Sequence, residues 1–348
     1  MFRELAFTPK NSSILPQLIT VPPCSTIPPY VKKIEFQGVE PLFKPNYTTS
    51  HLLSHFSSTV THLRLRDITF DDFQCLLDII CAFPHLQSLK LNHVFWGKSE
   101  GSRGMDGATR LLPKSVTSLE LKHTDLQDFA SWLLSHPSLP VVPHMDIGPF
   151  EQKDIPYAGK YMSLIGPAIT RLSYCFATVE FQHMCLFKLI SKLMPLPENK
   201  PIIPVAPDLS GSPTPASQYK LCFGLPICEH LASFINLRYL RIDGFMDITS
   251  PGNTTATYWA PRILASVKSP GLEHLLFGVV LSRAGDMDRC NVKWGYFDFV
   301  LSHESYSGLR KVEFEVKGRA QLDSVADLIA LRLPQVSELG LLHFSKAE

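Results

Sequence analysis

Residues 60–91 read VTHLRLRDITFDDFQCLLDIICAFPHLQSLKL, and this stretch decides the fold. It begins and ends with the same six-residue pattern, apolar-x-x-apolar-x-apolar, as VTHLRL at Val60 and LQSLKL at Leu86. In each copy the fourth and sixth positions alternate with polar residues, which is typical of a strand with one buried face. Between the copies, apolar residues recur at helical spacing, namely Phe73, Leu76, Leu77, Ile80 and Phe83. The stretch therefore predicts a strand, a helix and a second strand parallel to the first.

The six-residue pattern, called the repeat phrase below, recurs along the whole chain. Its eleven copies begin at Phe2, Val31, Val60, Leu86, Val116, Val142, Ile169, Leu237, Leu272, Leu309 and Val336. Successive copies start 26 to 37 residues apart, except for one interval of 68 residues after Ile169. Such a period is the signature of a solenoid, in which similar units stack and share a core. We predict an α/β solenoid over residues 1–348, with a curved parallel sheet on the concave side and helices on the convex side.

Amphipathic helices are predicted between the repeat phrases. Besides the helix after Val60, they run through Leu126, Phe129 and Leu133, through Trp259, Ile263 and Val267, and through Leu322, Val325, Ala326 and Ile329. Thr69 with Asp72, and Thr124 with Gln127, resemble capping boxes and predict where two of these helices start.

A proline-rich segment interrupts the pattern in the long interval. Residues 195–215 read PLPENKPIIPVAPDLSGSPTP and contain seven prolines without apolar periodicity. We predict an exposed insertion over residues 195–217 within the solenoid, as a loop or as an extended docking peptide.

Composition narrows the class of function. The chain has 33 basic and 32 acidic residues, which gives no electrostatic reason to expect nucleic acid or a membrane as partner. It has no secretory signal and no apolar run of about 18 residues, so an intracellular protein of the cytoplasm or nucleus is expected. Its eight cysteines include no C-x-x-C pair, and no G-x-S-x-G, H-E-x-x-H or G-x-G-x-x-G motif occurs. We expect no catalytic residue, no metal site and no cofactor.

The phrase pattern followed by a helix resembles leucine-rich repeats with long units. More narrowly, residues 60–96 are similar to the repeat region of F-box-type proteins from higher fungi, with a Phe-Pro-x-Leu corner at Phe83. The resemblance implies a substrate-recognition module of a ubiquitin ligase. The F-box itself is absent, so docking to a Skp-type adaptor is implied only if an F-box is encoded upstream. Ordinary repeats place an asparagine three residues after the last strand leucine, but this chain has residues such as Val39, Ile68 and Val94 there, which predicts irregular repeats.

A partner-binding surface can be placed from strand alternation. The third, fifth and seventh positions of each phrase point away from the helices and line the concave face. The candidate partner-binding residues are His62, Arg64, Arg66, Lys90, Asn92, Glu120, Lys122, His144, Asp146, Arg171, Tyr239 and Arg241. The set contains arginine and tyrosine, which are enriched in interface hot spots, and it is rich in basic residues from Arg64 to Lys122. We expect a protein partner with an acidic or phosphorylated segment.

Three hypotheses about function remain open at this point. The first is a non-catalytic protein-interaction scaffold that recognises substrates for a ubiquitin ligase. The second is a fragment of a complete F-box protein that acts in ubiquitination, and the third is an enzyme with an active site in its loops.

Overall fold

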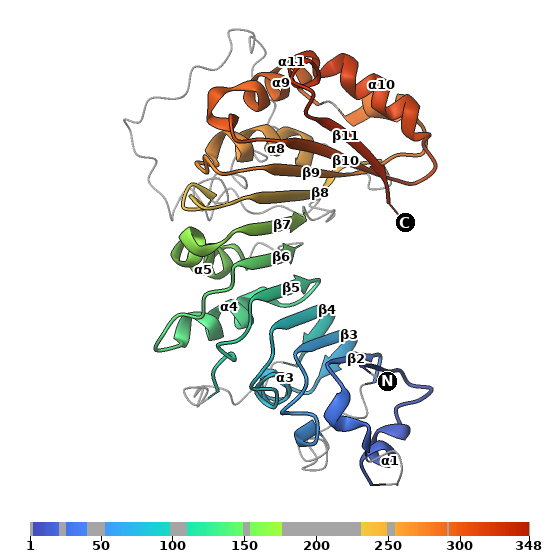
Figure 1. Cartoon of the computed structure of the whole chain (residues 1–348), viewed down its shortest axis with the longest axis vertical. Coiled ribbons are helices and arrows are strands. Elements are labelled where there is room, and N and C mark those ends of the chain that lie inside the picture. Colours follow the sequence, from blue (N-terminus) through green and yellow to red (C-terminus); the bar gives the residue numbers. More distant parts are fainter. Residues whose placement is uncertain are drawn as a thin grey trace.

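The computed structural model describes residues 3–20, 26–39, 53–97, 110–148, 154–175, 231–248, 255–290 and 292–347. In these ranges eleven strands form one sheet in the order of the chain, and each neighbouring pair is parallel. The strands are stacked along the long axis of the molecule, from β1 near the N-terminus to β11 near the C-terminus (Figure 1). Their bounds are β1 Glu4–Phe7, β2 Lys33–Gln37, β3 His62–Phe70, β4 Ser88–Trp96, β5 Ser118–Lys122, β6 His144–Gly148, β7 Arg171–Cys175, β8 Tyr239–Asp247, β9 His274–Val280, β10 Lys311–Lys317 and β11 Leu342–Lys346. The predicted solenoid of parallel strands is confirmed.

The repeat phrases set the register of the sheet. Neighbouring strands pair fourth position to fourth position and sixth to sixth, for example Leu63 with Leu89 and Leu65 with Leu91. These four side chains are at most 1% exposed. Strand β7 pairs with β8 in the same way although their phrases are 68 residues apart in sequence, so the long interval does not break the sheet.

The last phrase was placed wrongly by the sequence pattern. Residues Pro334–Glu338 form the short helix α11, and β11 begins only at Leu342. Because Leu342 pairs with Val312 and Phe344 with Phe314, the true phrase is LGLLHF, starting at Leu339. The pattern matches the sequence whether the phrase starts at Val336 or at Leu339, because apolar residues three positions apart are typical of a helix as well as of a phrase. Proline favours the first turn of a helix, and that preference decides between them here.

The helices cover the face of the sheet on which the fourth and sixth positions lie, and this is where the core sits. Their bounds are α1 Ile14–Thr20, α3 Phe73–Cys81, α4 Leu126–Ser135, α5 Ile155–Ile165, α8 Thr255–Ser266, α9 Trp294–Ser302, α10 Leu322–Arg332 and α11 Pro334–Glu338, with short 3₁₀ helices at Pro28–Tyr30, Gly166–Ala168, Ala284–Cys290 and Glu304–Tyr306. The four helices predicted from apolar spacing are present. The proline-rich insertion predicted at residues 195–217 lies outside the described residues.

Both predicted capping boxes are wrong. Helix α3 is capped by Asp72 itself, whose Oδ1 accepts a hydrogen bond from the Cys75 amide at 2.8 Å, while Thr69 belongs to strand β3. At α4, Thr124 donates instead to the Lys122 carbonyl oxygen at 3.1 Å. The Gln127 amide donates to Oδ1 of Asp154 at 3.0 Å. An aspartate of the following repeat therefore satisfies this helix end, which sequence spacing within one repeat cannot reveal.

In five repeats, one residue with a left-handed backbone conformation interrupts the regular alternation of side chains along the strand or just after it. The eighth position of the phrase has φ between 51° and 68° in these repeats, at Gly38, Asp67, His93, His123 and Gly244. One residue in this conformation acts as a bulge, which shifts the alternation of the side chains that follow by one position. The ninth positions therefore turn inward, and Val39, Ile68 and Val94 are at most 1% exposed. Apolar residues replace the asparagine ladder of ordinary repeats, as the residue types at these positions predicted.

Candidate partner-binding face

The concave face consists of three rows of side chains that cross the strands. Row three, row five and row seven are named after the phrase position that they share. The structure places all twelve predicted residues in these rows: His62, His144, Arg171 and Tyr239 in row three; Arg64, Lys90, Glu120, Asp146 and Arg241 in row five; Arg66, Asn92 and Lys122 in row seven. Each is exposed or half-buried, whereas the intervening fourth and sixth positions are buried.

An ion-pair network crosses strands β4, β5 and β6. The Lys90 ammonium lies 2.6 Å from Oε2 of Glu120, and the Lys122 ammonium lies 2.8 Å from Oδ2 of Asp146 and 4.0 Å from Oε1 of Glu120. Burial lowers the pKa of Lys122, but the two carboxylates outweigh this and raise the pKa above its ordinary value. The network contains two cations and two anions and is therefore neutral.

The remaining cations of the expected basic region are also paired. Arg64 lies 3.5 Å from Oε1 of Glu35, which comes from the preceding strand, and Nε of Arg66 lies 3.2 Å from Oδ2 of Asp67. The basic excess expected from Arg64 to Lys122 is thus balanced by neighbouring carboxylates. Glu35 and Asp67 were not among the predicted residues, although register alignment of the phrases would have put Glu35 beside Arg64.

A second neutral network crosses strands β8 to β10. The Arg241 guanidinium donates from Nε and Nη2 to the two carboxylate oxygens of Asp243, at 2.9 and 2.8 Å, and from Nη2 to Oε2 of Glu315 at 2.7 Å. The Lys317 ammonium lies 3.5 Å from the same Glu315 oxygen. Gly278 makes room for this arrangement, because a Cβ at that position would come within 2.5 Å of Oδ1 of Asp243. Glu315 was missed by sequence reasoning because its partner is 74 residues away.

Arg171 lies between the two networks. Its guanidinium lies over the ring of Tyr239 at 4.8 Å from the ring centroid, a cation–π contact. The Tyr239 ring meets the His274 imidazole edge-on at 5.0 Å, and Nε2 of His274 lies 3.0 Å from Oε2 of Glu313. Within the described parts of the chain, no carboxylate lies within 4.0 Å of Arg171.

Two stacked histidines mark the carboxyl-terminal rim of the same face. The imidazoles of His93 and His123 lie 4.3 Å apart, centroid to centroid, with 12° between their planes. Burial first, and then the nearby His93 and Lys122, lower the pKa of His123. Sequence reasoning missed this pair, whose signal is the residue type: histidine, asparagine and aspartate tolerate the left-handed conformation that both positions adopt.

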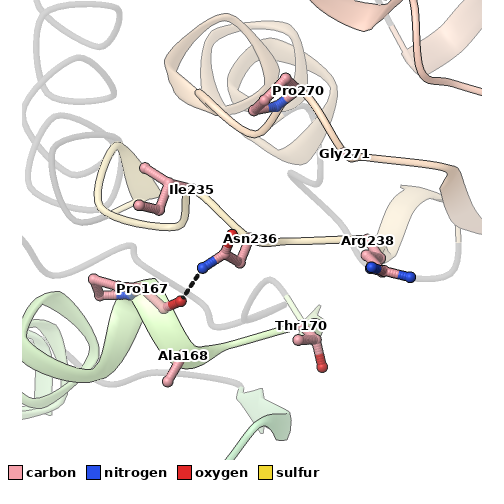
Figure 2. A pocket seen from close by; sticks show the side chains of 8 residues that line it. All are labelled: Pro167, Ala168, Thr170, Ile235, Asn236, Arg238, Pro270 and Gly271. Atoms are coloured by element: carbon pink, nitrogen blue, oxygen red, sulfur yellow. Dashed lines mark hydrogen bonds between the residues drawn. The ribbon is translucent and has the colours of Figure 1, made fainter.

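A hollow of about 510 Å³ opens at the amino-terminal edge of strands β7, β8 and β9. Figure 2 shows its eight lining residues: Pro167, Ala168, Thr170, Ile235, Asn236, Arg238, Pro270 and Gly271. The Asn236 side chain donates to the Pro167 carbonyl oxygen at 2.7 Å and joins the two turns that form one wall. Thr170 and Arg238 directly precede Arg171 and Tyr239, so this hollow adjoins the middle of row three.

Two kinds of reactive group would indicate chemistry among the described residues, namely clusters of metal ligands and activated thiols. No three histidine, cysteine, aspartate or glutamate side chains within them converge as metal ligands would. Burial raises the pKa of the thiols of Cys75, Cys81 and Cys175 to about 11 each, so these thiols are protonated at neutral pH and poor nucleophiles. None of the helices in the described ranges combines the length and apolar character needed to cross a bilayer.

Comparison with known proteins returns similarity of structure only. No family model matches the chain, and no curated protein matches its sequence. Among solved structures, the leucine-rich repeat-containing protein LegL7 from Legionella pneumophila is similar, with 12% identity and a TM-score of 0.43, over 97% of this chain and 98% of that one. A Bacteroides fragilis protein has the same identity and TM-score, over 99% of this chain and 73% of the other.

Proposed function

We propose that this chain is a protein-interaction scaffold, and that the concave face of its sheet is the docking surface. The observation that carries the proposal is a single continuous face, eleven strands long, on which polar, charged and aromatic side chains are held in three aligned rows. At about 4.8 Å per strand and about 3.3 Å per residue, the rows extend over about 48 Å by about 13 Å. That is on the order of 600 Å² before the flanking loops are added, close to the ~800 Å² that each partner buries in a stable complex.

The ion pairs support a role in binding because they fix the side chains before a partner arrives. A free lysine or arginine loses rotamer entropy when it is immobilised in an interface. On this face Lys90, Lys122 and Arg241 are already held by carboxylates within 2.6 to 2.9 Å. Much of this rotamer entropy is therefore already lost when the chain folds. A partner meets charged side chains in fixed positions.

The finer form of the proposal rests on the sequence resemblance alone. It is a substrate-recognition module of the F-box ubiquitin-ligase type, non-catalytic, intracellular, and joined to a Skp-type adaptor only through an F-box encoded upstream. A complex purified from the native cell tests this form. A Skp-type adaptor in that complex would support it, and a stable complex without one would leave only the general scaffold proposal.

The general proposal is tested by proximity labelling and affinity purification with matched variants. One variant reverses three concave charges, Arg64→Glu, Arg66→Glu and Lys90→Glu. The control variant makes the same charge change at exposed positions away from the rows, Lys160→Glu, Lys268→Glu and Arg319→Glu. We expect the concave variant to lose partners that the control retains, with unchanged circular dichroism for both. An identical set of partners for both variants would contradict the proposal.

A further inference from the structure

The distribution of charge on the concave face singles out one residue. Eight cations occupy rows three, five and seven of the described strands, and seven of them have a carboxylate oxygen within 4.0 Å: Lys33, Arg64, Arg66, Lys90, Lys122, Arg241 and Lys311. The eighth is Arg171, which has none among the described residues. It lies on β7, between one neutral network on β4–β6 and another on β8–β10. The charge of Arg171 is thus the uncompensated one at the centre of an otherwise balanced surface.

Polar side chains on β6, β7 and β8 lie around this charge. His144 is the row-three partner of Arg171 on β6, and Tyr239 is its partner on β8. Ser173 lies two residues further along β7 on the same face, is only 8% exposed, and its hydroxyl has no hydrogen-bond partner among the described residues. A buried hydroxyl without a partner costs free energy unless a ligand or water satisfies it. An unpaired cation and an unsatisfied hydroxyl therefore lie close together, with the Asp146 carboxylate beside Ser173 on β6, whose Oδ1 also has no hydrogen-bond partner among the described residues.

We propose that Arg171, His144 and Ser173 form a subsite that binds an anionic oxygen group, a carboxylate or a phosphomonoester, on a side chain of the partner protein. This inference rests on the proposed function and names the chemistry of its central contact. Guanidinium groups match the paired oxygens of both anions and make charge-assisted hydrogen bonds to them. The contact with the Tyr239 ring holds the guanidinium over row three without supplying a counter-charge.

The lowered pKa of His144 is also consistent with anion binding at this subsite. Packing first, and then the positive charge of Arg171, lower the pKa of His144 below its ordinary value. An anion seated between the two side chains would remove that repulsion and accept a hydrogen bond from the imidazole. The paired cations elsewhere on the face have no such vacancy, because an incoming anion would first have to displace Glu35, Glu120 or Asp146.

The first experiment uses the intact chain and two small probes. Backbone amide signals of Ser173 and Tyr239 are followed by NMR during titration with acetate or with methyl phosphate, against sodium chloride at equal ionic strength. The variant is Arg171→Gln. The matched control is Arg319→Gln, which removes the same charge from an exposed arginine that follows β10 and lies outside the rows and the hollow.

We expect saturable shifts in the wild-type chain and in Arg319→Gln, and no saturable shift in Arg171→Gln. Saturation by methyl phosphate alone assigns the subsite to a phosphorylated residue, and saturation by both probes assigns it to any acidic side chain. Shifts no larger than those with chloride, or shifts that persist in Arg171→Gln, would overturn the inference.

The second experiment separates this inference from the proposed function. With a partner captured by the concave face, Arg171→Gln is expected to weaken binding at least tenfold, and Arg319→Gln less than twofold. If Arg171→Gln binds as the wild type does while the triple variant at Arg64, Arg66 and Lys90 does not, the subsite is wrong and the scaffold proposal stands. If neither variant loses the partner, both proposals fail.

Discussion

Replacing Phe277 by alanine tests whether the repeats share one packed core. Phe277 on β9 is fully buried, and its ring lies 4.9 Å from Phe245, 5.2 Å from Phe297 and 5.3 Å from Phe314, measured between centroids. These rings come from strands β8 and β10 and helix α9, so one side chain joins three successive repeats. Phe277→Ala should lower the free energy of unfolding by about 3–5 kcal/mol, the usual cost of such a cavity.

The matched control is Phe299→Ala on helix α9. Phe299 is 58% exposed, so its truncation should change the free energy of unfolding by less than about 0.5 kcal/mol. Urea unfolding followed by circular dichroism measures the total effect. Hydrogen exchange measured by mass spectrometry then shows which strands are destabilised. In a solenoid, a local loss of stability affects mainly the neighbouring repeats.

The exchange data should show a local pattern. Protection should fall in Tyr239–Asp247, His274–Val280 and Lys311–Lys317 and change much less in His62–Phe70, six strands away from β9. Equal losses for Phe277→Ala and Phe299→Ala, or a uniform loss of protection from β1 to β11, would refute the reasoning that the core is built repeat by repeat.

Three further predictions concern stability. Asp72→Ala should cost about 1 kcal/mol because it removes the cap of α3, whereas Thr69→Ala should cost less, as measured by urea unfolding. His93→Val should cost about 1–2 kcal/mol because a β-branched residue resists a φ of 53°, and His93→Gly should cost less; equal costs would contradict this. Burial lowers the pKa of His136, and Nε2 of its neutral ring accepts a hydrogen bond from the Leu112 amide at 2.9 Å. The unfolded chain therefore takes up the proton first, and stability should fall as the pH drops from about 7 to about 5, a slope that His136→Gln should reduce.

Much of the fold could be predicted because the phrase encodes it locally. Alternation within six residues identifies a half-buried strand, and ten phrase positions agree with the sheet. The exception at Val336 arises because α11 and β11 both satisfy the pattern, and only pairing with β10 selects the frame that starts at Leu339. The helix caps could not be predicted reliably, because the Gln127 amide is satisfied by Asp154 of the next repeat.

The candidate face was predicted in outline but not in its charge balance. Strand alternation was enough to assign all twelve residues to the rows. Which charges remain available depends on rotamers and on partners from other repeats, such as Glu315 beside Arg241. Unlike Arg64, Arg171 has no carboxylate neighbour among the described residues, and this becomes visible once the strands are aligned.

Distances measured by electron paramagnetic resonance test the stacked sheet most directly. One spin label, attached through an unnatural amino acid, replaces His62 on β3, and the second replaces either Arg171 on β7 or Tyr239 on β8. At about 4.8 Å per strand, the two separations should be about 19 Å and about 24 Å, before small corrections for curvature and label length. The step from Arg171 to Tyr239 should thus equal one strand spacing although 68 residues separate them in sequence. A jump of tens of ångströms, or a broad distribution at Tyr239, would contradict a continuous concave face.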